Sequence, residues 1–427
     1  MDVAIAIAVV GLLIFLAHLF SGIFARTMIP DVLFLILIGL CLGPFLGIIT
    51  PAQFGGVGRV FTVITLVIIL FEGGLELDID VLKKSLRRTF TLTFISFIIT
   101  MFGVAMVTLW LTPLDVLLSL MLGAIVGSTS PAVIVPLVRK ITLQKETKTV
   151  LYLESAISDV LSIVVAFALL EAYNLGSLKY GLMVGRIISS FSLAAILGIA
   201  SAFGWSIILN KVRTLQNAIF TTPAFVFIVF GLAEMLGYSG YISALAFGIT
   251  LGNIEMFDFD RPFLEKYIPQ KPISLNETEK IFISEVVFLL KSFFFVYVGF
   301  SIRLEDTHMV FMGLILTAAI FILRLPVVRF TMDKNLPKSD ASFMSALVPK
   351  GLAAAVLASV PLQEGITEGL LMQNVSYAVV LFSIIFTSIL VFLLDRTFFS
   401  KVYGWVFSGY AISTTPHPHE PAKPSDK

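Results

Sequence analysis

The sequence predicts an all-α protein that crosses a membrane many times. Of its 427 residues, 58% are hydrophobic and only 13% are charged, and the mean hydropathy is +0.99. A soluble protein averages roughly 45–50% apolar and about 25% charged residues. The apolar residues also gather into long stretches. A helix needs about 20 mostly apolar residues to span a bilayer. About thirteen stretches come near this length, so the sequence predicts about thirteen transmembrane helices.

The expected spans follow one another with short polar connections. They cover 3–24, 29–47, 59–76, 89–111, 115–138, 148–172, 181–209, 216–236, 238–252, 280–300, 307–330, 341–361 and 371–398. The first is taken as a retained span, because no basic segment precedes it as in a cleaved signal peptide. An odd number of spans puts the two termini on opposite sides of the membrane.

The loop charges predict the orientation. Most of the 29 Lys and Arg residues lie after odd-numbered spans or in the tail, among them Lys83, Lys84, Arg139, Lys140 and Lys338. By the positive-inside rule the C-terminus is cytoplasmic and the N-terminus outside. The expected location is therefore the cell (inner or plasma) membrane, with a polar, Pro-rich, disordered cytoplasmic tail over 401–427.

Composition also excludes several classes of function. The 29 basic and 28 acidic residues balance, which argues against a nucleic-acid partner. The single Cys41 excludes an intrachain disulfide or a thiolate metal cluster. Two of the four His residues lie in the tail, and no Ser–His pair lies within the spans. Neither an enzyme nor a bound cofactor is expected.

Two of the expected spans are interrupted. Gly127-Ser128-Thr129-Ser130-Pro131 breaks the fifth span, and Val348-Pro349-Lys350-Gly351 breaks the twelfth. Proline removes an amide donor and clashes with the preceding turn. Paired interruptions in two halves indicate an inverted-repeat transporter with its site where the breaks cross. The alternative is a pair of ordinary proline kinks, which membrane helices tolerate.

The sixth span carries two carboxylates, in Glu154-Ser155-Ala156-Ile157-Ser158-Asp159. Ser155, Ser158 and Asp159 share one helical face. Charge in hydrocarbon is costly, so such a residue normally faces a pathway or a partner. Burial favours the protonated form of Asp159, which then exchanges a proton for a cation. The alternative is a structural hydrogen bond between helices.

Hard oxygen donors surround this carboxylate in the sequence. The Ser155 and Ser158 hydroxyls and carbonyls freed near Thr129 suit a monovalent cation such as Na⁺, K⁺ or Li⁺. Glu154 points to another face, and pairing with Arg324 of the eleventh span relieves two isolated charges. Alternatively, Arg324 extends its side chain to the cytoplasmic edge.

Three further charges lie near breaks or span ends. Glu72 ends the third span, where it either guides cations inward or is an ordinary interfacial charge. Lys350 either compensates the carbonyl ends of the half-helices or pairs with a carboxylate. Lys291 is either functional or a helix-packing residue.

These residues together resemble the cation:proton antiporter superfamily, nearest the sodium/proton exchangers of the NhaP type. The similarity covers about residues 1–400. It rests on the following segments: Phe71-Glu72-Gly73-Gly74-Leu75, Ser128-Thr129-Ser130-Pro131, Glu154-Ser155 to Asp159, Phe293-Phe294-Phe295 to Gly299, Arg324, and Pro349-Lys350-Gly351.

The resemblance implies a homodimer in which a six-helix core moves like an elevator against a scaffold. The scaffold would comprise 1–88 and 173–306, and the two core repeats 89–172 and 307–400. It implies an ion site at Thr129, Ser155 and Asp159, an approach lined by Glu72, and a structural ion pair between Glu154 and Arg324. Pro131, Lys350 and Gly351 would shape the breaks.

The sequence departs from the family pattern at three positions. Ser130 replaces the usual Asp of the first break, Ser158 precedes Asp159 where Asn or Asp is usual, and Lys350 stands where Arg is common. Ser130 and Ser158 remain candidate ion-site residues. One titrating carboxylate suggests electroneutral exchange of one cation for one proton.

The sequence therefore favours antiport of Na⁺ or K⁺ against H⁺. The alternative is a sodium-coupled symporter of a small organic solute, which needs a wider polar cavity than the sparse polar residues near the breaks suggest. A channel-like or sensory protein is disfavoured by Asp159, because a pore gains little from a site at which protons compete.

Overall fold

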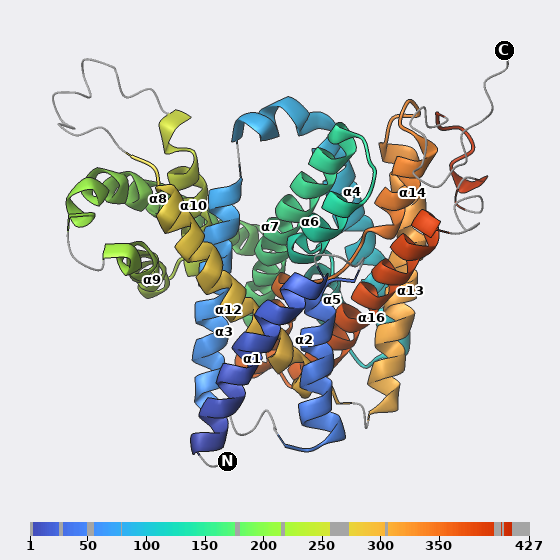
Figure 1. Ribbon diagram of the computed structural model, residues 1–427, viewed down its shortest axis with the longest axis horizontal. Helices are drawn as coiled ribbons and strands as arrows, with labels where there is room; N and C mark the ends of the chain where they lie inside the picture. The colour runs from blue at the N-terminus through green and yellow to red at the C-terminus, as the bar shows by residue number, and fades with distance from the viewer. Residues whose placement is uncertain are drawn as a thin grey trace.

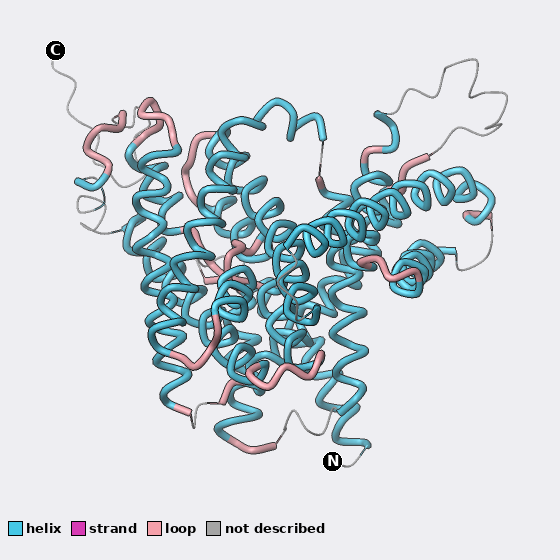
Figure 2. Tube along the Cα trace, turned by 180° about the vertical axis from the view of Figure 1, so that it is seen from behind, coloured by secondary structure: helices cyan, strands magenta, loops and turns pink. Residues whose placement is uncertain are grey.

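The protein is helical throughout the part of the chain that the structure describes. The computed structural model describes residues 3–24, 29–48, 55–77, 79–175, 180–214, 218–256, 273–303, 306–396, 403 and 405–411. Within these ranges, the extended pairing is limited to one isolated bridge between Pro337 and Ala411. Figure 2 shows the same helical bundle from behind. The predicted all-α membrane fold is confirmed.

One group of helices contains a small apolar cluster of its own, while its first two helices pack into a larger apolar core shared with the rest of the bundle. It comprises α1 (Val3–Phe24), α2 (Asp31–Leu40) with a π-helical turn at Cys41–Phe45, α3 (Gly55–Glu76), α8 (Tyr180–Val212), α9 (Thr221–Met235), α10 (Gly240–Gly252) and α12 (Glu277–Ser301). Phe71, Trp205 and Phe247 are central to a buried cluster that joins α3, α8, α9, α10 and α12.

Glycines bring two helix pairs of this group into close contact. A Cβ on Gly74 of α3 or on Gly248 of α10 would collide with the backbone of the other helix. The same holds for Gly39 of α2 and Gly299 of α12. Small residues allow membrane helices to approach closely, which maximises dispersion contacts where lipid supplies no hydrophobic driving force.

The second group of helices contains both expected breaks. It comprises α4 (Ile79–Leu111), α5 (Val116–Ile125), α6 (Pro131–Lys140), α7 (Lys145–Leu175), α13 (Thr307–Thr331), α14 (Lys338–Ala346), α15 (Leu352–Gln363) and α16 (Gly369–Arg396). Figure 1 shows α8 and α9 on one side of the molecule and α13, α14 and α16 on the other. Helix α4 packs against α5, α7 and α13, and α16 against α13 and α15.

Seven helices of the described chain are long and apolar enough to cross a membrane. They lie within 89–111, 145–174, 189–209, 218–235, 277–301, 307–331 and 369–395. Shorter apolar helices include α10 and the half-helices α5 and α15. The expected spans 115–138 and 341–361 are each two half-helices, as the interruptions predict. The total of thirteen spans stays a prediction.

The turn between α3 and α4 is held by Asn253, at the end of α10. Its Oδ1 accepts a hydrogen bond from the Ile79 amide at 2.9 Å, and its Nδ2 donates to the Leu77 carbonyl at 2.6 Å. Helix α4 begins at Ile79 and runs without interruption to Leu111. The boundary expected between 88 and 89 therefore falls inside a continuous helix.

The beginning of the C-terminal tail is ordered, which corrects the expectation of disorder over 401–427. Phe407 and Tyr410 are buried. The Tyr410 hydroxyl lies 3.0–3.3 Å from the carbonyl oxygens of Val328, Arg329 and Met332 at the end of α13. The last carbonyls of a helix lack amide partners, and the Tyr410 hydroxyl supplies a hydrogen-bond donor to them. Residues 412–427 lie outside the described chain.

Candidate ion-binding site at the crossing of two broken helices

The two interrupted helices meet at their breaks. Residues 126–130 separate α5 from α6, and residues 347–351 separate α14 from α15. The Ser130 amide donates to the Pro349 carbonyl at 2.8 Å, which joins the two breaks directly. A Cβ on Gly351 would collide with the Ser130 side chain. The expected crossing is present, and Gly351 permits its close approach.

Lys350 is buried in this crossing with no exposed surface. Its ammonium group donates to the Ser128 carbonyl at 2.8 Å, and its backbone amide donates to Ser383 Oγ on α16 at 2.9 Å. Asp159 and Glu154 lie close enough to interact with it electrostatically. The side chain thus satisfies a carbonyl that the break of α5 has released, as the compensating role predicts.

The polar face of α7 fills the space beside the first break. Ser158 Oγ accepts a hydrogen bond from the Thr129 amide at 3.0 Å and lies 3.1 Å from Thr129 Oγ1. Ser162 Oγ donates to the Ala124 carbonyl at 2.6 Å and so satisfies the last turn of α5. Ser155 Oγ donates within its own helix to the Tyr152 carbonyl at 2.9 Å.

Asp159 lies next to the first break. Its carboxyl group interacts with the Ser128 side chain and with the charge of Lys350. Asp159 retains some accessible surface, whereas Ser128, Thr129, Ser155 and Ser158 are all at most 4% exposed. The arrangement therefore places a carboxylate among buried oxygen donors, which suits a small hard cation or a proton.

Glu154 and Arg324 form a buried bidentate ion pair. Their side chains are 3% and 1% exposed. Arg324 Nη2 donates to Glu154 Oε2 at 2.7 Å, and Nη1 donates to Glu154 Oε1. The guanidinium also donates to Ser96 Oγ on α4 at 2.7 Å and to the Met344 carbonyl on α14 at 3.2 Å. Arg324 thus joins four helices and does not extend to the membrane edge.

Glu72 lies among helices of the first group and not at the crossing. Its carboxyl group interacts with Ser284 and Lys291 of α12 and with Glu76 of its own helix. Lys291 Nζ in turn lies 3.8 Å from the Asp31 carboxylate of α2. The structure therefore gives Glu72 polar partners on α12, and its part in guiding cations stays a prediction.

Ser130 is oriented toward the second break. Its hydroxyl is buried and has no hydrogen-bond partner among the described atoms, and the side chain contacts the position of Gly351. Pro131 is the first residue of α6. Because the amide of a first helical residue has no partner within the helix, proline is tolerated there and starts the second half-helix.

Sequence reasoning missed three groups that take part in this network. Ser96 and Ser383 come from helices far along the chain, and no local pattern distinguishes them from other buried serines. Ser128 belongs to the quoted Gly127–Pro131 segment, but its side chain was not singled out. A clustered metal site of His, Cys, Asp and Glu does not occur among the residues that the structure describes.

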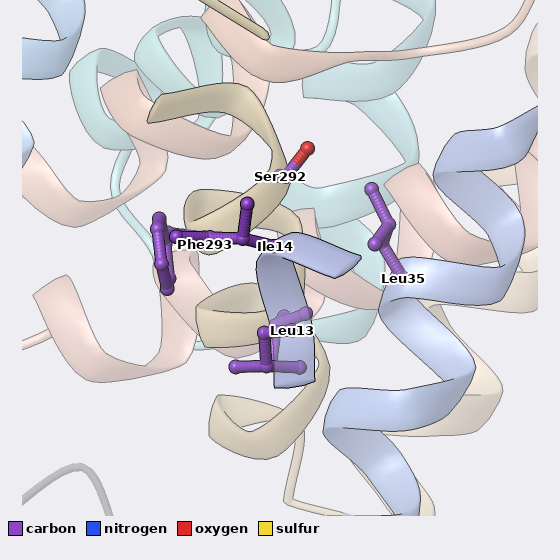
Figure 3. Close-up of a pocket in the computed structure, with 6 residues that line it drawn as sticks. Leu13, Ile14, Leu35, Ser292 and Phe293 are labelled. Carbon is purple, nitrogen blue, oxygen red and sulfur yellow. The ribbon is translucent and has the colours of Figure 1, made fainter. Parts of the chain in front are cut away.

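A separate small cleft lies between α1, α2 and α12. Figure 3 shows its lining by Leu13, Ile14, Leu35 and Phe293, with the Ser292 hydroxyl nearby. Such an apolar lining holds no charge for a cation, so this cleft is unrelated to the crossing.

Comparisons with known proteins agree with this architecture. A model of the transmembrane sodium/hydrogen exchanger family matches residues 11–396. Na⁺/H⁺ antiporter 1 of Methanocaldococcus jannaschii is 26% identical over 375 residues, covering 84% of this chain and 83% of that protein. K⁺/H⁺ antiporter NhaP2 of Shewanella oneidensis is 24% identical and aligns with 75% of this chain and 54% of its own length.

A solved structure has the same fold. The sodium proton antiporter MjNhaP1 from Methanocaldococcus jannaschii, at pH 8, superimposes with a TM-score of 0.74 at 23% identity. The match covers 91% of this chain and 100% of that one. The two proteins therefore share their overall fold.

Proposed function

Because the chain belongs to the transmembrane sodium/hydrogen exchanger family, we propose that it is a secondary active antiporter. It exchanges a monovalent cation, Na⁺ or K⁺, for H⁺ across the cell membrane. Relatives named as Na⁺/H⁺ and as K⁺/H⁺ antiporters support exchange of a cation against protons and leave both cations as candidates.

The observation that carries this proposal is the position of Asp159. It is a carboxylate beside two crossed helix breaks, and it interacts with the buried Ser128 hydroxyl and the buried Lys350 ammonium group. Such a group binds either a proton or a cation, and each displaces the other. The ion-site ligands are Asp159, a Ser155 hydroxyl oxygen whose lone pairs remain free, and Thr129. Ser158 holds Thr129 in position.

The buried charges support exchange of one cation for one proton. Glu154 neutralises Arg324, and the pair takes no part in the cycle. Lys350 lies near Asp159, and exchange of one cation for one proton requires only that its protonation state stays the same throughout the cycle. A proton and a monovalent cation each add one positive charge to this site, so the two loaded forms of the protein carry equal charge.

The helix packing supports an elevator-type alternating access. The first helix group forms the scaffold and the dimer interface, and the second group forms the moving core that holds the crossing. The ion pair of Arg324 joins only core helices, and the cluster around Phe247 only scaffold helices. Basic residues at the start of α4, at the end of α6 and after α13 support a cytoplasmic C-terminus and an external N-terminus.

The central test replaces Asp159 by Asn, which keeps the shape and removes the titrating group. In proteoliposomes with a preset pH gradient, we expect added Na⁺ or K⁺ to dissipate the gradient with wild-type protein. Asp159→Asn should abolish this response because neither ion then binds productively. A comparison across Li⁺, Na⁺, K⁺ and Rb⁺ identifies the preferred cation.

Glu146→Gln is the matched control, since Glu146 is an exposed carboxylate in the first turn of the same helix. It should exchange ions as the wild type does. Exchange that persists at the wild-type rate in Asp159→Asn would refute the proposal. A wild-type response that requires an organic solute would instead favour sodium-coupled symport.

A further inference from the structure

The hydroxyl group of Ser128 does not hold any backbone group of the fold in place. The side chain is completely buried, and its Oγ makes no hydrogen bond to a backbone group. The group that it interacts with is the carboxyl group of Asp159. A hydroxyl has one donor and two acceptor lone pairs, so this contact leaves part of its capacity unused at the Asp159 carboxyl group.

The neighbouring hydroxyls are already engaged in holding the backbone. Ser158 binds the Thr129 amide and donates to the Ser155 carbonyl at 3.1 Å. Ser162 donates to the end of α5, and Ser155 to the Tyr152 carbonyl. In the first break, the hydroxyls of Ser128 and Ser130 hold no backbone group, and of these two Ser128 is the one that interacts with the Asp159 carboxyl group.

Lys350 fixes the position of Ser128. Its ammonium group donates a hydrogen bond to the Ser128 carbonyl at 2.8 Å, so this carbonyl is not available to a cation. Ser128 contributes to the site through its hydroxyl alone. Since the Thr129 amide is held by Ser158 at the next residue, the backbone on that side of the Ser128 side chain is also fixed.

We propose that Ser128 Oγ is a direct ligand of the transported cation, together with the carboxylate of Asp159. This inference rests on the proposed antiport function and adds a ligand to its site. A hydroxyl serves each form of Asp159: it donates a hydrogen bond to the free carboxylate, accepts one from the protonated acid, and offers a lone pair to a bound cation. Ser128 thus lowers the cost of each exchange step.

The test compares Ser128→Ala with Ser119→Ala in proteoliposomes. Ser119 is the matched control because it is also a fully buried serine whose hydroxyl holds no backbone group, and it lies on the adjoining helix α5. We expect Ser128→Ala to raise the apparent KM for the preferred cation roughly tenfold at little change in maximal rate, as loss of one polar contact to a charge predicts. Ser119→Ala should leave KM unchanged.

A second variant distinguishes coordination from packing. Ser128→Cys keeps the volume and replaces a hard oxygen by a soft sulfur. We expect the ratio of Tl⁺ affinity to K⁺ affinity to be higher in Ser128→Cys than in the wild type. Ion binding is measured in detergent through the unfolding temperature of the protein. The affinity is taken from the ion concentration that gives half of the maximal rise in this temperature. The measurement requires no transport.

The outcomes separate the two proposals. An unchanged KM in Ser128→Ala and an unchanged Tl⁺/K⁺ ratio in Ser128→Cys would overturn the role of Ser128, while loss of exchange in Asp159→Asn would still support antiport. If Asp159→Asn also exchanges normally, the antiport site itself is wrong. A Ser128→Ala protein that unfolds without ions, where Ser119→Ala is stable, would assign Ser128 a structural role and also overturn the inference.

Discussion

Arg324 shows how a single residue is tolerated in the interior of a membrane protein. Its guanidinium donates to Glu154, Ser96 and the Met344 carbonyl, so the charge is both neutralised and hydrogen-bonded. A buried ion pair contributes little net stability, because desolvation offsets the attraction. Removing one partner is nevertheless costly, since the other charge is then left uncompensated.

Glu154→Gln should therefore reduce the amount and stability of folded protein more than it alters cation affinity. The expected loss is about 3–5 kcal/mol of unfolding free energy, the range for a broken buried pair. Fluorescence-detected chromatography after heating, combined with the apparent KM of the surviving protein, measures both effects.

Lys280→Gln serves as the comparison for this variant. Lys280 forms an ion pair with Glu277 at 3.1 Å, but both side chains are more than half exposed. Exposed pairs contribute about 0–1 kcal/mol, so this change should be nearly silent. Equal stability of Glu154→Gln and Lys280→Gln would contradict the structural role assigned to the buried pair.

At the scale of elements, the crossing depends on the absence of one side chain. Gly351 has a φ of −138°, outside the left-handed region that favours glycine, so the main requirement for glycine here is space. The Ser130 side chain occupies the volume that a Cβ at position 351 would need. The hydrogen bond from Ser130 to Pro349 depends on this approach.

Gly351→Ala should accordingly push the two breaks apart. We expect a loss of about 1–3 kcal/mol in stability, the cost of overpacking, and slowed exchange. Ser130→Gly in the same protein should restore part of both, since it removes the colliding atoms. Gly204→Ala, at a helical glycine with open space around it, is the control. Wild-type exchange by Gly351→Ala would mean that the breaks adjust without cost.

At the scale of the whole molecule, the proposed one-for-one exchange predicts the response to membrane potential. Arg324 faces Glu154 and Lys350 lies near Asp159. In the proposed cycle, the form that carries a proton and the form that carries a cation have the same net charge. Movement of either loaded form would then transfer the same charge in opposite directions.

The exchange rate should for this reason be insensitive to membrane potential. Proteoliposomes clamped with an ionophore for an ion other than the transported one provide the measurement, at equal pH gradient and varied potential. A change of less than about twofold across 100 mV is expected, whereas moving one uncompensated charge is worth about 2.3 kcal/mol over that range. A steep dependence would show that a second group besides Asp159 releases a proton during the cycle. Lys350, which lies near Asp159, is the first candidate for that group.

Much of the architecture could be read from the chain because hydrocarbon imposes strict rules on sequence. Apolar stretches predicted the helices, and Gly, Ser and Pro at 127–131 and 348–351 predicted both breaks. The tail was misjudged, because Phe407 and Tyr410 gain their burial from α13, a partner far away in sequence. The helix expected from residue 89 begins at Ile79, because helix formation continues through the polar residues that precede the apolar stretch, and the domain boundary near residue 88 stays a prediction.

The sequence by itself determined that Asp159, Glu154 and Arg324 needed partners, because an isolated charge is too costly in lipid. It also determined where the chain must unwind, because proline and glycine act locally on the backbone. Only the tertiary structure decided which groups meet: Arg324 with Glu154, Lys350 with the Ser128 carbonyl, and Glu72 with α12 and not with the crossing. Lys350 and Ser128, for example, lie 222 positions apart in the chain. Such pairings depend on how whole helices pack and not on any local spacing.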